Sequence, residues 1–386
     1  MSVWLKRSCA KVRLGRGLVV AVLAALALTR PAAAQVPHIV QVTVGASHVC
    51  ALDTTARVWC WGGNNYGQLG DGSLTNRRTP VRVRGISNAV HIAAGYDHTC
   101  AVLENGRMSC WGRNTYGQLG DGTLTDRLLP VRVSGMRRVV EVTAGEQNSC
   151  ARMETGRVFC WGGVWRLQPD TDPVRIAIRD VTGISFGERT ACAVRGDGRA
   201  RCWGYGGWGS LGNGSTEDSS RPVGVRRVST ARQIATSRGH SCAVLETGRV
   251  LCWGYNGSGE IGDGTTIRRL TPVRVLGLDN AVQVELGLVH SCAVLDTGHV
   301  RCWGSNILGQ LGDGTETDRW TSVRASGLSD AVQVSLGRYT TCAVQASGGV
   351  QCWGYGGAGA LGRGDDYFSL TPVPVLFPDL AAAGEP

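Results

Sequence analysis

The chain has 386 residues, of which 56 are glycine and only 18% are charged. Such a composition argues against a coiled coil or another helical architecture and favours many short strands joined by turns. The formal net charge of +10 is concentrated at the N-terminus, and no later run of basic residues resembles a phosphate-binding tract. We therefore expect no nucleic-acid partner.

Residues 1–34 predict a secretory signal peptide. A basic segment precedes the apolar run of residues 18–28, and small residues around Ala34 provide a cleavage site. The apolar run is too short to span a bilayer comfortably, although an uncleaved anchor is the alternative. Removing this segment takes away six basic residues and no acid, so the formal net charge falls from +10 to +4. The mature chain, 35–386, is expected to be secreted or periplasmic without a membrane span.

A repeat of about 50 residues fills the mature chain. Two cysteines ten residues apart mark each of seven units, and the spacing between units is constant except for one step of 42 residues after the third. A fixed period of this length predicts a propeller or a solenoid. The approximate units are 38–86, 87–136, 137–179, 180–228, 229–278, 279–328 and 329–377.

Every unit predicts four strands in the same order. An alternating strand such as 281–287 leads through a short bend to the first cysteine strand. A tight turn and a strand ending in Cys-Trp-Gly follow, and a Gly-rich connection then leads to a Thr-Pro-Val strand. No segment remains for helices. The sequence therefore predicts an all-β fold, a single seven-bladed β-propeller of four-stranded antiparallel blades.

The tight turn predicts how the cysteines pair. If Cys100 faces Cys110 across a hairpin, a three-residue loop ends at Gly106, where a positive φ is needed. Six units have glycine at this position, and Ala56 is the exception. In an oxidising compartment each pair should form a disulfide. The expected pairs are Cys50–Cys60, Cys100–Cys110, Cys150–Cys160, Cys192–Cys202, Cys242–Cys252, Cys292–Cys302 and Cys342–Cys352.

Metal sites are the alternative use of these residues. Four units carry His-x-Cys, but a single blade offers only three zinc ligands. The carboxylates of the Gly-Asp-Gly segments stand alone, whereas calcium takes six or more oxygen ligands. We expect no metal and no cofactor, with the histidines hydrogen-bonding at strand starts and the Asp residues in turns. The tryptophan after each second cysteine should pack between blades.

The repeat resembles that of the regulator of chromosome condensation family. Units two and six carry the resemblance best, with Cys-Trp-Gly-x-Asn followed by Gly-Gln-Leu-Gly-Asp-Gly. The resemblance implies a seven-bladed propeller closed by strands from opposite chain ends, here 38–45 with 371–375. It also implies several functions: the founder is a nuclear guanine-nucleotide exchange factor, and exported members include a protein inhibitor of β-lactamase.

Alternating strand directions predict that the bends and the Gly-rich connections share one face. Their residues differ between units while the framework repeats, and aromatic and Arg residues are common interface anchors. Neutral sequence drift at solvent-exposed positions explains the variation equally well. Trp165 lies in unit three, which lacks the Gln-Leu-Gly-Asp segment, so it either anchors a partner or fills the gap. The candidate partner-binding residues are Tyr66, Tyr96, Asp97, Tyr116, Glu146, Trp165, Glu188, Arg189, Trp208, Arg238, Leu308, Arg338 and Tyr339.

The sequence favours an exported, monomeric scaffold that binds another protein through this variable face. Catalytic motifs are not recognisable, so we expect no enzyme activity. A secreted inhibitor of an enzyme such as a hydrolase is the first alternative. Glycan binding at the channel mouth and guanine-nucleotide exchange are weaker ones.

Overall fold

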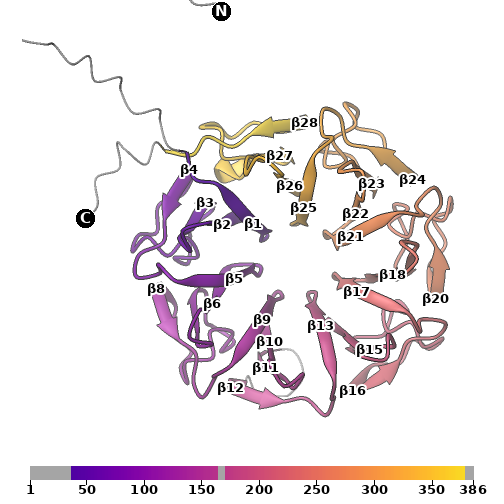
Figure 1. The fold of residues 1–386 in the computed structure, drawn as a ribbon, viewed down its shortest axis with the longest axis horizontal. Coiled ribbons are helices and arrows are strands. Elements are labelled where there is room, and N and C mark those ends of the chain that lie inside the picture. The colour runs from indigo at the N-terminus through magenta and orange to yellow at the C-terminus, as the bar shows by residue number, and fades with distance from the viewer. Residues whose placement is uncertain (1–35, 164–169, 379–386) are drawn as a thin grey trace, which may run out of the picture.

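A computed structural model describes residues 36–163 and 170–378. Seven four-stranded antiparallel sheets form a ring around a central channel, which confirms the predicted β-propeller (Figure 1). The predicted signal peptide and Trp165 lie outside the described residues. Among the residues described, no helix is both long and apolar enough to cross a bilayer.

Each blade is one contiguous segment whose strands run from the channel outward. The strands of successive blades are β1 (Ile39–Val44), β2 (His48–Asp53), β3 (Val58–Gly62) and β4 (Arg77–Arg82); β5 (Ala89–Ala94), β6 (His98–Leu103), β7 (Met108–Gly112) and β8 (Arg127–Arg132); β9 (Val139–Ala144), β10 (Asn148–Met153), β11 (Val158–Gly162) and β12 (Asp170–Arg175); β13 (Val181–Phe186), β14 (Thr190–Arg195), β15 (Ala200–Gly204) and β16 (Ser219–Gly224); β17 (Ala231–Thr236), β18 (His240–Leu245), β19 (Val250–Gly254) and β20 (Arg269–Arg274); β21 (Ala281–Leu286), β22 (His290–Leu295), β23 (Val300–Gly304) and β24 (Arg319–Arg324); and β25 (Ala331–Leu336), β26 (Thr340–Gln345), β27 (Val350–Gly354) and β28 (Ser369–Pro374).

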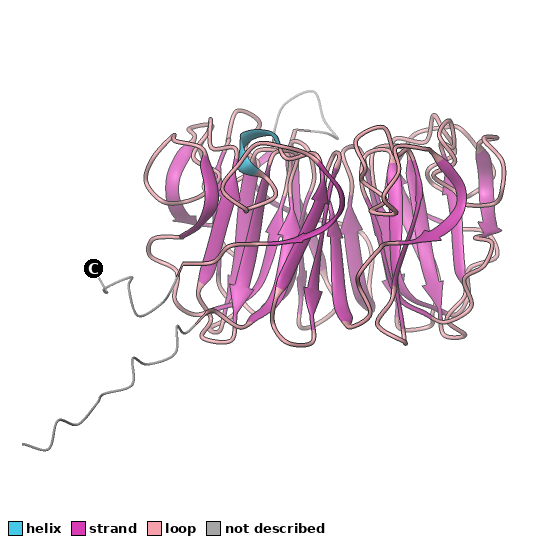
Figure 2. Ribbon diagram, turned by 90° about the horizontal axis from the view of Figure 1, so that it is seen from above, coloured by secondary structure: helices cyan, strands magenta, loops and turns pink. Residues whose placement is uncertain are grey.

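The two ends of the ring carry different loops because neighbouring strands are antiparallel. The bends between the first and second strands and the connections between the third and fourth strands share one end, here called the bend face. The tight hairpins and the links between blades share the other end, here called the hairpin face. The short 3-10 helix η1 (Gly357–Gly359) belongs to a connection of the bend face (Figure 2).

The predicted hairpin register is confirmed. Cys100 lies opposite Cys110, and Val102 lies opposite Met108. Gly106 has a φ of 70°, and Ala56 adopts the same conformation with a φ of 63°. All seven cysteine pairs are disulfides with Cα–Cα distances of 4.0 to 4.1 Å. These bonds use the thiols that a zinc site would require.

Tryptophan joins each blade to the one before it. The fully buried Trp111 donates its Nε1–H to the backbone oxygen of Gln68 at 2.9 Å. A Cβ on Gly70 would lie only 2.7 Å from the same nitrogen, so the close approach requires glycine there. Equivalent bonds are made by Trp61, Trp161, Trp253, Trp303 and Trp353. In the part of the chain that is described, Trp203 Nε1 has no partner, because unit three lacks the segment that would supply it.

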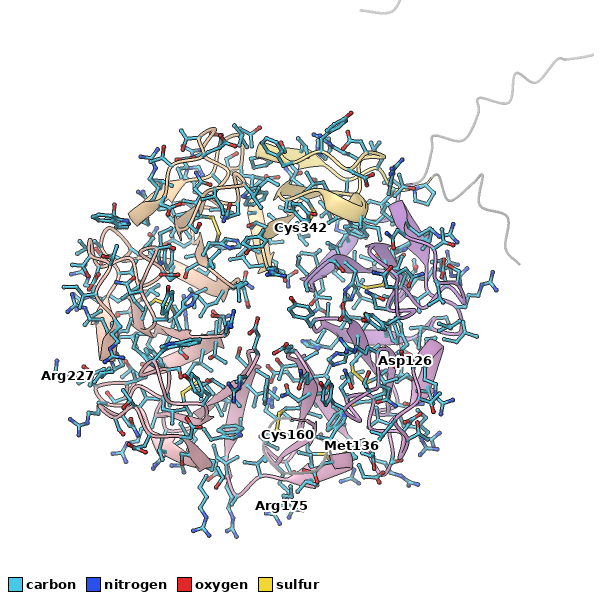
Figure 3. All side chains as sticks on the ribbon, turned by 180° about the vertical axis from the view of Figure 1, so that it is seen from behind. Asp126, Met136, Cys160, Arg175, Arg227 and Cys342 are labelled. Atoms are coloured by element: carbon cyan, nitrogen blue, oxygen red, sulfur yellow. A yellow bond between two sulfur atoms is a disulfide. The ribbon has the colours of Figure 1, made fainter. Side chains whose placement is uncertain are left out.

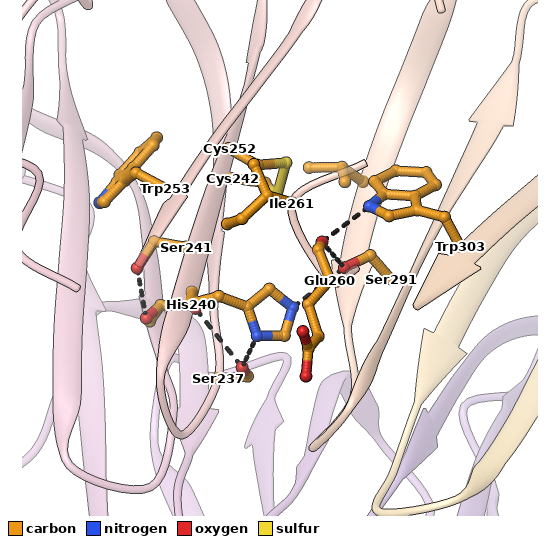
Figure 4. The surroundings of a disulfide bond; sticks show 12 residues. Ser237, His240, Ser241, Cys242, Cys252, Trp253, Glu260, Ile261, Ser291 and Trp303 are labelled. Atoms are coloured by element: carbon orange, nitrogen blue, oxygen red, sulfur yellow. Dashed lines mark hydrogen bonds between the residues drawn. A yellow bond between two sulfur atoms is a disulfide. The ribbon is translucent and has the colours of Figure 1, made fainter. Parts of the chain in front are cut away.

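Histidine makes a second contact between blades. His98 Nε2 and Ser149 Oγ are 2.9 Å apart, and Ser149 in turn donates to the backbone oxygen of Gln118. Figure 4 shows the equivalent histidine, His240, beside the Cys242–Cys252 disulfide. Burial lowers the pKa of His98 to about 3, so the imidazole is neutral at physiological pH.

The predicted closure of the ring is wrong. Residues 38–45 do not pair with 371–375, because β1 belongs to the first blade and β28 to the last. Each unit already supplies four consecutive strands, so none is left to exchange. Hydrogen bonds between the last and first blades close the ring instead. The backbone nitrogen of Ile39 donates to the oxygen of Gly348 at 3.0 Å. The Gln333 amide bonds both the backbone nitrogen and the oxygen of Val42, at 2.8 and 3.1 Å, and Trp61 donates to the backbone oxygen of Ala360.

Replacing both members of one disulfide, Cys292→Ala with Cys302→Ala, should lower the free energy of unfolding by about 3 kcal/mol, because the bond restricts the unfolded chain. Urea unfolding at neutral pH measures the change. Peptide mapping of the unreduced wild-type protein should find only pairs ten residues apart. Links between blades would contradict the hairpin register.

The buried histidines should make folding sensitive to acid. They titrate near pH 6.5 when unfolded and near 3 when folded, so their stabilisation is complete above pH 6.5 and is lost as the pH falls toward 3. Thr190 and Thr340 occupy the position of His98 in other units. His98→Thr should therefore reduce the loss of folding stability on acidification by at most about 1.4 kcal/mol per pH unit. Urea unfolding at pH 7, 5.5 and 4 tests this, and an unchanged slope would refute it.

Candidate functional site

The seven bends meet at the mouth of the central channel and line a cavity of about 190 Å³. Six bends begin with glycine, and their backbones crowd one another: a Cβ on Gly95 would lie 2.5 Å from the oxygen of Gly145. The glycine ring therefore fixes the path of each bend, and the next residue carries the variation. These residues are Ala46, Tyr96, Glu146, Glu188, Arg238, Leu288 and Arg338.

Two arginines lie at the mouth beside polar partners. Arg338 Nη1 donates a hydrogen bond to the Tyr96 hydroxyl at 3.1 Å, and its guanidinium lies 5.3 Å from the centre of the Tyr339 ring. Arg238 Nε lies 3.3 Å from a carboxylate oxygen of Glu188. Both arginines are exposed, so they are held in place yet accessible to a partner.

An aromatic group adjoins these arginines. Trp208 lies between Tyr205 and Tyr255, with ring centres 5.2 and 5.5 Å away. The Arg238 guanidinium is 5.8 Å from the Trp208 ring, and that of Arg189 is 4.8 Å from the Tyr205 ring. The mutual contacts reduce the freedom of long side chains before any partner binds. We call Tyr96, Glu188, Arg189, Tyr205, Trp208, Arg238, Tyr255 and Arg338 the mouth cluster.

A second group lies over the first two blades of the bend face. The Arg113 guanidinium is 4.8 Å from the Tyr66 ring and 6.0 Å from the Tyr116 ring. Its Nη1 is 3.4 Å from a carboxylate oxygen of Asp97. Tyr66, Tyr116 and Asp97, which are predicted partner-binding residues, therefore surround Arg113, which the sequence did not predict.

The structure brings most of the candidate residues into these two groups. Glu146 lines the cavity beside the mouth cluster. Leu308 stands apart in the sixth blade, where its backbone nitrogen donates to Gln310 Oε1 at 2.9 Å. Arg113, Tyr205 and Tyr255 were missed. All three stand third after a second cysteine, a position that varies between units as much as the positions that were selected.

Glu141, Glu188 and Glu285 at the channel have raised pKa values, and burial is the main cause for Glu141. Burial, reinforced by the charge of Glu146, raises the pKa of Glu188 to about 7, although Arg238 opposes this shift. Burial also raises the pKa of Glu285 to about 7, with a smaller contribution from Glu141. Gln283 and Gln233 donate only long hydrogen bonds to Glu285, at 3.3 and 3.4 Å. Glu285 is the fifth residue of its first strand. In the first and seventh blades this position is Thr43 and Ser335, and each hydroxyl instead accepts a backbone N–H from the next blade.

The Gly-Asp-Gly carboxylates have the structural role that was predicted for them. Asp71 accepts a hydrogen bond from the Ser73 backbone nitrogen at 2.9 Å and pairs with Arg77 at 2.8 Å. Within the described ranges, no group of three or more His, Cys, Asp or Glu side chains is arranged to hold a metal ion.

A repeat-built β-propeller with a variable loop face defines the class of this protein. The family model of the regulator of chromosome condensation (RCC1) repeat matches residues 56–102, 105–152, 197–244, 247–294 and 297–344. The chain therefore belongs to the RCC1 repeat family. A 48-residue stretch is 44% identical to the human E3 ubiquitin-protein ligase HERC2; it covers 12% of this chain and about 1% of that protein's length.

Solved structures share the fold at low sequence identity. Human WBSCR16 is 22% identical, with a TM-score of 0.70 over 78% of this chain and 84% of that one. Prp20p from Saccharomyces cerevisiae is 24% identical, with a TM-score of 0.69 over 78% and 80%. The ectodomain of the Arabidopsis thaliana receptor kinase ACR4 is 19% identical, with a TM-score of 0.52 over 89% and 99%.

Glu285→Gln should stabilise the fold at high pH. The carboxyl ionises near pH 4.5 when unfolded and near 7 when folded, so the wild type loses stability as the pH rises through this window. The variant should gain at most about 3 kcal/mol over wild type between pH 4.5 and 8. Urea unfolding at both pH values measures it. The exposed Glu154→Gln, a matched control on the hairpin face, should show no such gain, and an equal gain there would refute the assignment.

Proposed function

We propose that this protein is an exported, non-catalytic scaffold that binds another protein through its bend face. The observation that carries the proposal is the mouth cluster, in which exposed arginines are held against aromatic rings on a rigid frame. Tyr, Trp and Arg provide most of the binding energy in many protein interfaces.

The opening at the mouth is narrow. The cavity there holds about 190 Å³, and the channel beneath it, which shares Thr43, Ser185 and Glu285 with that cavity, holds about 480 Å³. A protruding side chain of a partner fits a space of this size. The surrounding arginines and aromatic rings are already ordered by their own contacts, so little conformational freedom is lost on binding.

Similarity to other propellers agrees with this role but does not name the partner. The structure of Prp20p was reported with its binding to Gsp1p and histones. We propose that this chain likewise acts by binding protein, with specificity set by the residues that vary between its seven bends. The seven disulfides support the proposed export, since such bonds persist in oxidising compartments.

The test compares the mature protein with Trp208→Ala/Arg238→Ala. Each is used to capture partners from the organism's own envelope and culture-supernatant extracts, and surface plasmon resonance then measures the affinity of the captured partner. The double variant should bind at least tenfold more weakly, because two central anchors are removed. Trp320→Ala is the matched control, since Trp320 is 51% exposed on an outer strand. Wild-type affinity in the double variant would refute the proposal.

A further inference from the structure

Exposed arginines gather on one side of the hairpin face. They come from segments spread over nearly one hundred residues, at the ends of outer strands, in hairpins and in the links between blades; Figure 3 labels two of them, Arg175 and Arg227, at the rim. We call this set the arginine arc: Arg132, Arg137, Arg138, Arg157, Arg175, Arg179, Arg199, Arg226 and Arg227.

Backbone hydrogen bonds make the arc continuous. The nitrogen of Glu154, in the hairpin of the third blade, donates to the oxygen of Arg138 in the preceding link at 2.8 Å. The nitrogen of Gly196, in the next hairpin, donates to the oxygen of Asp180 at 2.8 Å, and Ala231 donates to Gly198 at 2.9 Å. Hairpins and links therefore alternate side by side around this part of the ring, and the arginines follow one surface.

The arc carries an uncompensated positive charge. Within the described residues, none of its nine guanidinium groups forms an ion pair. Its loops hold three acids, Glu154, Asp180 and Asp197, and the last two already lie 3.6 and 3.1 Å from Arg195. Elsewhere on the hairpin face, seven arginines accompany six acids, so the charge is confined to one side.

Two further features of this face suggest what covers it. Each first strand begins here, and its second residue leaves a valine exposed in five blades: Val40, Val90, Val140, Val282 and Val332, by 40 to 55%. The chain also enters the fold at this end, because β1 begins at Ile39, only about ten residues after the apolar segment 18–28. If that segment acts as the predicted export signal, the hairpin face lies nearest to the membrane only until cleavage near Ala34 releases the chain.

We propose that the hairpin face binds the headgroups of an anionic phospholipid surface through the arginine arc. Arginines near an anionic surface attract it at a range of about 10 Å without needing one fixed geometry. The exposed valines add an apolar contact at the same end of the ring. This surface is separate from the mouth cluster, so either proposal can fail alone.

Co-sedimentation with lipid vesicles tests the proposal on the mature protein, residues 35–386. The wild type should bind vesicles of 70% phosphatidylcholine and 30% phosphatidylglycerol and should be released from them in 0.5 M NaCl. It should not bind vesicles of pure phosphatidylcholine. Since each arginine contributes roughly fivefold, Arg138→Glu/Arg179→Glu should weaken binding at least 25-fold. Arg84→Glu/Arg324→Glu, with the same charge change on this face but outside the arc, should weaken it less than threefold.

Several results would overturn the proposal. These are no binding to the anionic vesicles, equal losses in the two double variants, and binding of the arc to duplex DNA or heparin with no vesicle binding. Thermal unfolding of both variants checks that they fold. Capture of a partner through the bend face should be unchanged in the arc variant, which separates this test from that of the mouth cluster.

Discussion

The fold depends on one contact, in which a buried indole N–H meets a backbone carbonyl of the preceding blade; six of the seven blades make it. The contact needs a glycine beside the ring: a Cβ on Gly120 would lie 2.6 Å from Trp161 Nε1. A buried donor without a partner costs about 1–3 kcal/mol, so six such bonds specify the angle between blades strongly. Cys-Trp-Gly therefore recurs together with Gly-x-Leu-Gly, or Gly-x-Ile-Gly in the fifth unit. The first motif supplies the indole, and the second supplies the carbonyl and the space for the ring.

Unit three shows that the ring tolerates one exception. Trp203 has no described hydrogen-bond partner, yet it is only 1% exposed. Ile178, Val181 and Ile184 pack in the same apolar cluster as this ring. Burial of apolar surface thus holds the ring in place where the polar contact is missing. Because the fixed residues lie between blades, loops at either end can change or shorten without breaking the fold.

The sequence predicts what is local and repeated. Ten-residue spacing and Gly106 determine the hairpin register, and alternating strand direction assigns Tyr96 and Glu188 to one face. Closure was wrong because it rested on family resemblance, although four strands per unit already argued against an exchange. The burial of Glu285 and the contacts of Arg113 with Tyr66, Tyr116 and Asp97 depend on how neighbouring blades are placed in the ring. The arginine arc was not predicted either, because its residues are scattered through turns from 132 to 227. Which arginines keep an uncompensated charge depends on the ion pairs that form in the folded ring.

The two ends of the ring use the same residue type in different ways. On the bend face, Arg113, Arg238 and Arg338 lie against rings or carboxylates, so their positions are fixed and suit recognition of one shape. In the arc the guanidinium groups form no ion pair with the described residues, and their field reaches about a Debye length, 8–10 Å, into solvent. A field of this kind suits a surface of repeated charges rather than one shape. With the hairpin face on such a surface, the bend face points away from it, and the mouth cluster stays open to a protein partner.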